Sequence, residues 1–277
     1  MTDAFGAFAC GDHPLAPLTP AQLPRALALS TLVGWNQTAA DWRVFLDRGQ
    51  VMGLDDGEPE LAASVATLHY GAVAWISMVL VRPDQRRRGL ARAAMQWAIA
   101  SLRQAGAGCI ALDATPDGRQ VYRQLGFSDA WGFSRWSVPP LPPLPGTRRM
   151  MAADWPAVLA LDAAAFGADR AWLLGALPAG FVVEEGGRVV AAALRREGTR
   201  WPQAGPIFAR EARHGQALLA AVLPGGGIAD LRDDVPFLPW LEEELGARLR
   251  RFTRMVLDGA LPGDVGGCMA VLGPEFG

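Results

Sequence analysis

A strand, a charged turn and a helix follow one another directly between Val73 and Ala105, and this succession constrains the fold more than any other stretch. Val73–Val81 is apolar except for Ser77 and rich in β-branched and aromatic residues, which is typical of a strand covered on both faces. From Leu90 the apolar residues recur on one side of a helix, and Gly106 can end it. The stretch predicts a central strand of a sheet, followed by a helix that packs on that sheet.

The turn between this strand and this helix reads Arg86-Arg87-Arg88-Gly89-Leu90-Ala91. A glycine at the start of a helix lets a ligand approach the main chain closely. The first N–H groups of the helix and its dipole favour an anion, and three arginines add positive charge. The turn therefore predicts a phosphate-binding site, and the alternative is a solvated basic turn before a core helix.

These residues resemble the acetyl-CoA binding motif of the GNAT acetyltransferase superfamily, Gln/Arg-x-x-Gly-x-Gly/Ala between a central strand and the next helix. The resemblance implies acetyl-CoA as the acyl donor, held by Arg86, Arg87, Arg88, Gly89, Leu90 and Ala91. Its pantetheine arm would enter where the central strand and the strand Cys109–Asp113 separate. There it would bond to the main chain of Val79 and Val81, with a backbone N–H polarising the thioester carbonyl.

The order of predicted elements extends this resemblance. Thr19–Val138 predicts two helices, three antiparallel strands, a helix, a strand, a helix and a strand, which is the order of a GNAT domain. The strand Cys109–Asp113 follows a helix and should pair in parallel with Val73–Val81. The residues up to Ala16 show little pattern and are expected to form an arm.

The same order recurs after a stiff, proline-rich segment. The sequence therefore predicts an α/β fold with two tandem GNAT-like domains, each a mostly antiparallel twisted sheet with a parallel central pair and flanking helices. The predicted division is an acetyl-CoA-binding domain at residues 1–138, a linker at residues 139–146 and a degenerate domain at residues 147–277. In this second copy Arg210–Gln216 lacks the motif, which makes anion binding there doubtful, and Glu242 stands where Tyr122 would be. The pair resembles bacterial two-domain GNAT proteins.

Two residues are candidates for proton transfer. Tyr122 opens Tyr-Arg-Gln-Leu-Gly-Phe, which resembles the family's Tyr-x-x-Leu-Gly-Phe ending. The resemblance implies that this phenol donates a proton to the departing CoA thiolate, a task suited to a pKa of about 10; the alternative is an aromatic core contact. Asp113, at the end of its strand, is a candidate general base, or else a turn or helix-capping residue.

The acceptor side is implied by the first two predicted helices, at Thr19–Leu29 and Thr38–Gly49, and by their connection. In the family this pair covers the acceptor side of the cleft, so Trp35, Asn36 and Trp42 are candidates for contacting the acceptor. The alternative is that both tryptophans only pack.

Composition narrows the chemistry. The net charge of −2 and the pI near 6.0 do not favour a nucleic acid or an anionic membrane as partner. All 26 basic residues are arginine, which excludes a Schiff-base, pyridoxal or P-loop lysine. The three cysteines and three histidines have neither disulfide-framework nor metal-ligand spacing, so no metal is expected. Without a signal region or a membrane-length apolar run, the chain is expected to be soluble and cytoplasmic.

The sequence thus favours an N-acetyltransferase that moves an acetyl group from acetyl-CoA to a small-molecule amine by direct attack, with Tyr122 as general acid. A peptide or protein acceptor stays open within the same class. The alternative from another class is a non-catalytic CoA-binding or sensing module. The oligomeric state also stays open, with a homodimer as one possibility.

Overall fold

The computed structural model describes residues 9–10 and 13–277, which divide into two compact units. The first unit holds the described residues up to Leu112 together with Leu257–Gly259. The second holds Asp113–Val256 and Ala260–Gly277. In neither unit is any described helix long and apolar enough to cross a membrane.

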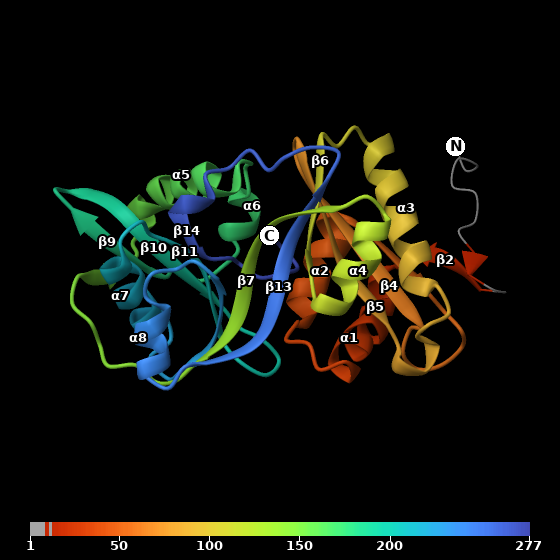
Figure 1. Ribbon diagram of the computed structural model, residues 1–277, viewed down its shortest axis with the longest axis horizontal. Helices are drawn as coiled ribbons and strands as arrows, with labels where there is room; N and C mark the ends of the chain where they lie inside the picture. The colour runs from red at the N-terminus through yellow and green to blue at the C-terminus, as the bar shows by residue number, and fades with distance from the viewer. Residues whose placement is uncertain (1–8, 11–12) are drawn as a thin grey trace. The chain divides into compact units, whose positions relative to one another are not determined.

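The sheet of the first unit has one parallel pair among antiparallel strands (Figure 1). Its strands lie side by side in chain order: β1 (Ala9–Cys10), β2 (His13–Pro17), β3 (Gln50–Leu54), β4 (Ala63–Tyr70), β5 (Val73–Val81) and β6 (Cys109–Ala114), of which the last two residues belong to the second unit. β5 and β6 are parallel, as predicted, because a helix separates them in the chain. β2 corrects the expectation of a patternless arm up to Ala16, since it pairs antiparallel with β3; residues 1–8 and 11–12 lie outside the described part.

The helices of the first unit begin where the sequence predicts. They are the short 3₁₀ turn η1 (Pro20–Gln22), α1 (Leu23–Leu32), α2 (Ala39–Arg48) and α3 (Leu90–Gln104). A capping box starts α2, because Thr38 Oγ1 accepts the Asp41 N–H at 3.2 Å and the Asp41 carboxylate accepts the Thr38 N–H at 2.7 Å. α3 packs on β4 and β5 through a buried stripe that includes Ala94, Trp97 and Leu102.

The second unit is also a mixed sheet with helices. In spatial order its strands are β13 (Ala247–Leu257), β7 (Ser128–Val138), β12 (Gly227–Arg232), β14 (Cys268–Ala270), β11 (Gln203–Phe208), β10 (Arg188–Arg196), β9 (Phe181–Glu185) and β8 (Thr147–Arg149). Its helices and 3₁₀ turns are α4 (Pro116–Gln124), η3 (Ala152–Asp154), α5 (Trp155–Phe166), α6 (Ala171–Leu174), α7 (Ala212–Val222), α8 (Leu238–Glu243) and η4 (Val265–Gly267). With a parallel contact between β11 and β12, both units confirm the predicted fold class.

The packing divides the chain at a different place from the proline-rich segment. β7, predicted as the last strand of the first domain, pairs antiparallel with β12 and with β13, which Figure 1 shows running beside it. Leu141, within residues 139–146, is only 6% exposed and belongs to the core of the same unit. The segment therefore packs on the second unit, and the compact units separate between Leu112 and Asp113. The division at residues 1–138 and 147–277 rests on the repeated element order and stays a prediction.

Candidate functional site

A bulge interrupts β5 near its carboxyl end. Ala66 faces Ser77 and Ser64 faces Leu80, so two residues of β5 stand opposite one residue of β4. Met78 lies in the bulge with φ +52°, a left-handed conformation that is uncommon outside glycine, and its carbonyl accepts the Ser64 hydroxyl at 2.8 Å. Bulges bend a strand and are frequent beside functional sites. Here the bend falls just before the residues predicted to bind pantetheine.

The parallel ladder between β5 and β6 ends before this bulge. It runs from the pair Val73 and Cys109 to the pair Trp75 and Ala111. Beyond it, the Arg82 N–H donates to Ala62 O at 2.9 Å, which places this group on the β4 side. Because main-chain groups alternate along a strand, Val81 directs its N–H group to the opposite edge, and Val79 lies in the bulge beside it. We name this edge of β5, Ser77–Val81, the β5 slot.

The slot leads into an exposed turn with two left-handed residues. After the 3₁₀ turn η2 (Pro83–Gln85), Arg87 has φ +62° and Gly89, the N-cap of α3, has φ +83°. Left-handed residues in a turn can direct main-chain N–H groups toward an anion. Arg86, Arg87, Arg88 and Gly89 are all exposed, whereas Leu90 is buried and anchors α3. The predicted phosphate turn thus has a suitable main-chain geometry beside three accessible guanidinium groups.

Arg82 fixes the start of this turn, although it was not predicted as a site residue. Its buried guanidinium donates to Asp56 at 2.6 Å, to Asp84 at 2.7 Å and to the Glu60 carbonyl at 3.1 Å. The hydrogen bond from Arg82 lowers the pKa of Asp84 to about 2, and it also lowers the pKa of Asp56. The available signal was an arginine directly after an apolar strand, with carboxylates in the preceding hairpin.

The three acceptor candidates, Trp35, Asn36 and Trp42, lie in different environments. Trp42 is fully buried and its indole N–H donates to Ser30 Oγ at 3.1 Å, which is the packing role left open by the sequence. Asn36 is 4% exposed, and Trp35 is half-buried. Trp42 therefore lies in the core, while the other two belong to the loop between α1 and α2.

Two further polar groups of the first unit stand out. Among the described residues, the Gln37 side-chain carbonyl and the Ser77 hydroxyl are buried and have no hydrogen-bond partner. A buried polar atom without a partner costs about 1–3 kcal/mol, so a ligand that supplies one is favoured. The sequence signals were Gln37 in the polar connection and Ser77 as the one polar residue of an apolar strand. Neither was predicted as a site residue.

Tyr122 lies in the second unit, on α4, and is half-buried. Its ring contacts that of Phe127, with centroids 6.2 Å apart. Gly118, one helical turn earlier, makes room for the ring, because a Cβ there would lie 3.0 Å from it. Desolvation raises the pKa of Tyr122 to about 12, so the phenol keeps its proton at neutral pH.

Asp113 also lies in the second unit and forms a buried ion pair. Both carboxylate oxygens accept hydrogen bonds from Arg254, at 2.9 and 2.8 Å, and neither side chain is more than 4% exposed. Burial raises the pKa of Asp113, while the Arg254 charge opposes that rise. Of its two predicted roles, this geometry favours the structural one.

Comparisons with known proteins agree with the resemblance that the sequence suggests. Residues 27–127 match the family model described as the acetyltransferase (GNAT) family. This part of the chain is thus similar to a GNAT acetyltransferase domain, which confirms the resemblance drawn from the sequence. A search of curated protein sequences gave no match.

Solved structures share the GNAT fold along most of the chain. A candidate acetyltransferase from Pyrococcus horikoshii has a TM-score of 0.80 at 17% identity, over 96% of each chain. A tandem GNAT protein from the clavulanic acid biosynthesis pathway has a TM-score of 0.60 at 13% identity, over 89% of this chain and 98% of that one. A GCN5-related N-acetyltransferase from Sphaerobacter thermophilus has a TM-score of 0.59 at 16% identity, over 88% and 94%. At these identities the likeness concerns the fold.

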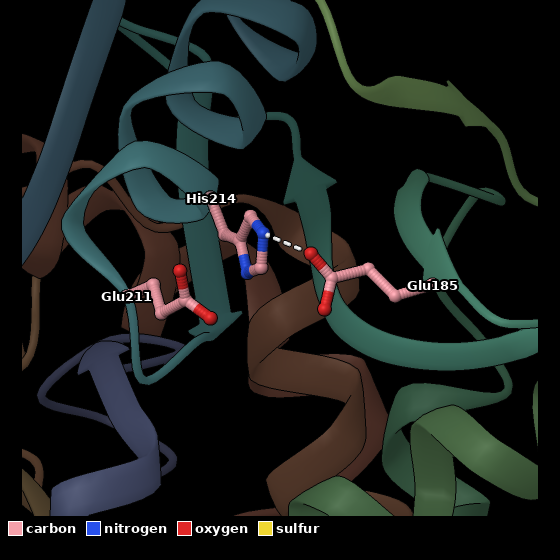
Figure 2. A group of neighbouring side chains, drawn as sticks. All are labelled: Glu185, Glu211 and His214. Atoms are coloured by element: carbon pink, nitrogen blue, oxygen red, sulfur yellow. Dashed lines mark ion pairs between the residues drawn. The ribbon is translucent and has the colours of Figure 1, made fainter.

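In the second unit, acidic groups lie near the turn that corresponds to Arg86–Ala91 of the first unit. Glu211 and His214 follow β11 at the start of α7, and Glu185 ends β9. Their carboxylate and imidazole atoms lie within 4.8 Å of one another, and Figure 2 shows His214 facing Glu185; His214 Nε2 lies 3.2 Å from a Glu185 carboxylate oxygen. Arg213 already donates to Glu211 at 2.6 Å and to Glu185 at 2.8 Å. The two carboxylates are thereby neutralised, and the group is best described as an ion-pair network at the start of α7. It gives no support to anion binding in the second copy.

A hollow of about 330 Å³ in the second unit has mainly apolar walls. They include Trp131, Phe208 and Cys268, whose thiol pKa burial raises to about 11. Arg170 and Arg254 also border the hollow, but both pair with buried carboxylates, of Asp162 and Asp113. Their charge is therefore already compensated within the protein.

We predict that Arg254→Met will lower the free energy of unfolding by about 3–5 kcal/mol, because it leaves the buried Asp113 carboxylate without a partner. Arg195→Met is the control, since its pair with Glu197 is exposed and should contribute less than about 1 kcal/mol. Equilibrium urea unfolding measures both. The double variant Arg254→Met, Asp113→Leu should recover most of the loss; equal effects in the two single variants would contradict a structural role for Asp113.

Proposed function

We propose that this chain is an N-acetyltransferase that transfers the acetyl group of acetyl-CoA to an amine of a small molecule. The observation that carries the proposal is the continuity of the β5 slot with the Arg86–Ala91 turn, both within the first unit. One long donor with a pyrophosphate at one end and a thioester at the other suits this arrangement. The GNAT domain supports acyl-CoA as the class of donor.

The pyrophosphate would lie in the turn. Its negative charge suits the helix N-terminus of α3, the N–H groups turned by Arg87 and Gly89, and the neighbouring guanidinium groups. The pantetheine amides would then extend along β5 as a short additional strand, bonded to Val79 and Val81. A main-chain N–H near the bulge would polarise the thioester carbonyl.

The transfer would proceed by direct attack. The neutral amine adds to the thioester carbonyl carbon, and the tetrahedral intermediate collapses by breaking the C–S bond. Tyr122 would donate its phenolic proton to the leaving thiolate, which gives CoA-SH, and the proton lost by the amine would return through water to the tyrosinate. A pKa of about 12 keeps the phenol in its acid form across the neutral range. We assign Asp113 to holding Arg254, and not to proton removal.

The acceptor would be recognised at the loop between α1 and α2. The Gln37 carbonyl can accept an amine N–H, and the Ser77 hydroxyl can bond to a further polar group of the acceptor. Trp35 and Asn36 of the same loop complete the proposed acceptor side. These polar groups suit a small molecule with an amine and a second polar group.

A non-catalytic CoA-binding module is the second candidate. The observation that favours it is the engagement of Asp113 by Arg254, which removes the carboxylate that the sequence offered as a base. Both candidates predict binding of acetyl-CoA, so only turnover distinguishes them.

Replacing Tyr122 by phenylalanine should lower kcat about 100-fold or more, because a general acid typically contributes 10²- to 10⁴-fold. The dissociation constant for acetyl-CoA should change less than about twofold, since the ring remains. The measurement is CoA-thiol release with acetyl-CoA and a panel of primary amines, with binding followed by calorimetry. The rate should show no decline from tyrosine ionisation below about pH 11, given its raised pKa.

Tyr70→Phe is the matched control, since Tyr70 lies on β4 and is the second of the two tyrosines. Unchanged turnover in Tyr122→Phe would remove the acid role. Absence of turnover with every amine, together with intact acetyl-CoA binding, would favour the non-catalytic module.

Gln37→Leu should raise the KM for the acceptor about tenfold and leave acetyl-CoA binding unchanged, because it removes a buried hydrogen-bond acceptor without changing the donor slot. Gln104→Leu, at the exposed end of α3, is the control. Steady-state kinetics with the best amine of the panel give the result. An effect confined to kcat, or equal in the control, would place acceptor recognition elsewhere.

A further inference from the structure

The second unit contains its own counterpart of the β5 slot. β11 and β12 are parallel, like β5 and β6, and they also pair over a short stretch, Gln203 with Ile228 and Ala204 with Ala229. As with β5 and β6, a helix separates the two strands in the chain. Beyond Ala204 the two strands diverge, which would leave room for an extended ligand.

In the second unit this gap is filled by the protein itself. β14 lies between the two diverging strands and pairs antiparallel with both, Ala270 standing opposite Ile207 on β11 and Leu231 on β12. The contact continues at both ends of β14. Ala209 N–H donates to Gly267 O at 3.1 Å, and Val271 N–H donates to Asp230 O at 3.0 Å.

The main chains approach so closely that one strand needs a glycine. Gly205, on β11, has φ +152°, and a Cβ at this position would lie 2.1 Å from the carbonyl oxygen of Val271. Since such a distance is far inside van der Waals contact, any larger residue would push the segment out of the gap. The local sequence of β11 is therefore adapted to this occupant.

Buried polar contacts hold the rest of the segment. Arg196 donates to the Leu272 carbonyl at 3.2 Å and forms an ion pair with Glu275, with both side chains less than 5% exposed. Arg170 donates to the carbonyl of Phe276 at 3.1 Å. Met269, Ala270, Val271, Leu272 and Phe276 are each less than 5% exposed. The segment is packed as core.

We propose that Gly267–Phe276 permanently fills the gap between β11 and β12, which is the second unit's counterpart of the β5 slot. The segment thereby closes the second unit to acyl-CoA. An extended peptide strand takes the place that the proposed function gives to pantetheine in the first unit, and uses the same kind of main-chain hydrogen bonds. The ion-pair network at the start of α7 agrees with this, because its arginine is already paired with Glu185 and Glu211, whereas a pyrophosphate would need an available cationic turn. The inference uses the proposed function only to name the excluded ligand.

The test is hydrogen exchange of the full chain, measured by mass spectrometry with and without acetyl-CoA. In the free protein, residues 267–277 should exchange slowly, and acetyl-CoA should leave their exchange, and that of residues 203–208, unchanged. Glu275→Gln should speed the exchange of residues 267–277 at least about tenfold, because it breaks a buried ion pair. Glu197→Gln, in an exposed pair with Arg195, should leave that exchange unchanged.

Fast exchange of residues 267–277 in the free protein would overturn the proposal. Protection of residues 203–208 by acetyl-CoA would also overturn it, because the ligand would then bind in the gap. Faster exchange of residues 267–277 on addition of acetyl-CoA would do the same, because the segment would then be a displaceable lid. The proposed function fails by a different result, namely no response to acetyl-CoA in residues 79–92. In that case the slow exchange of residues 267–277 and its loss in Glu275→Gln would still decide whether the gap is permanently filled.

Discussion

The three-residue ladder between β5 and β6 is the constraint on which the rest of the first unit depends. A parallel pair needs a crossover, and the crossover here is α3, whose buried stripe rests on β4 and β5. Because the ladder ends at Trp75 and the bulge at Met78 bends β5, the last residues of the strand keep an edge without a β6 partner. The same crossover places a helix N-terminus directly after that edge.

The sequence predicted the parts of the fold that depend on local pattern. Each of these features depends on only a few neighbouring residues, so composition and spacing were sufficient to identify them. They are the strand Val73–Val81, the capping residue Thr38 and the turn at Gly89. The position of β14, and the pairing of β7 with β12 and β13, depend on contacts between distant segments. Cys268–Ala270 is too short to show an alternating pattern, and nothing within β7 indicates which neighbour it chooses.

The candidate site divides in the same way. The arginine turn and the slot at Val79 and Val81 follow from a motif and its context. Whether a buried polar residue has a partner cannot be inferred from sequence, because the partner is brought near only by folding. Asp113 is engaged by Arg254, 141 positions away, whereas the Gln37 carbonyl has no partner among the described residues. Asp113 therefore has a structural role, and Gln37 is a proposed binding group.

The most direct test of this account is calorimetric titration of the full chain with acetyl-CoA, which gives affinity and stoichiometry together. The account predicts one molecule bound per chain, with binding lost in Arg86→Glu, Arg88→Glu and retained when exposed Arg250 and Arg251 are reversed in the same way. No binding by the wild-type chain, or binding that survives charge reversal in the turn, would contradict the donor site at Arg86–Ala91.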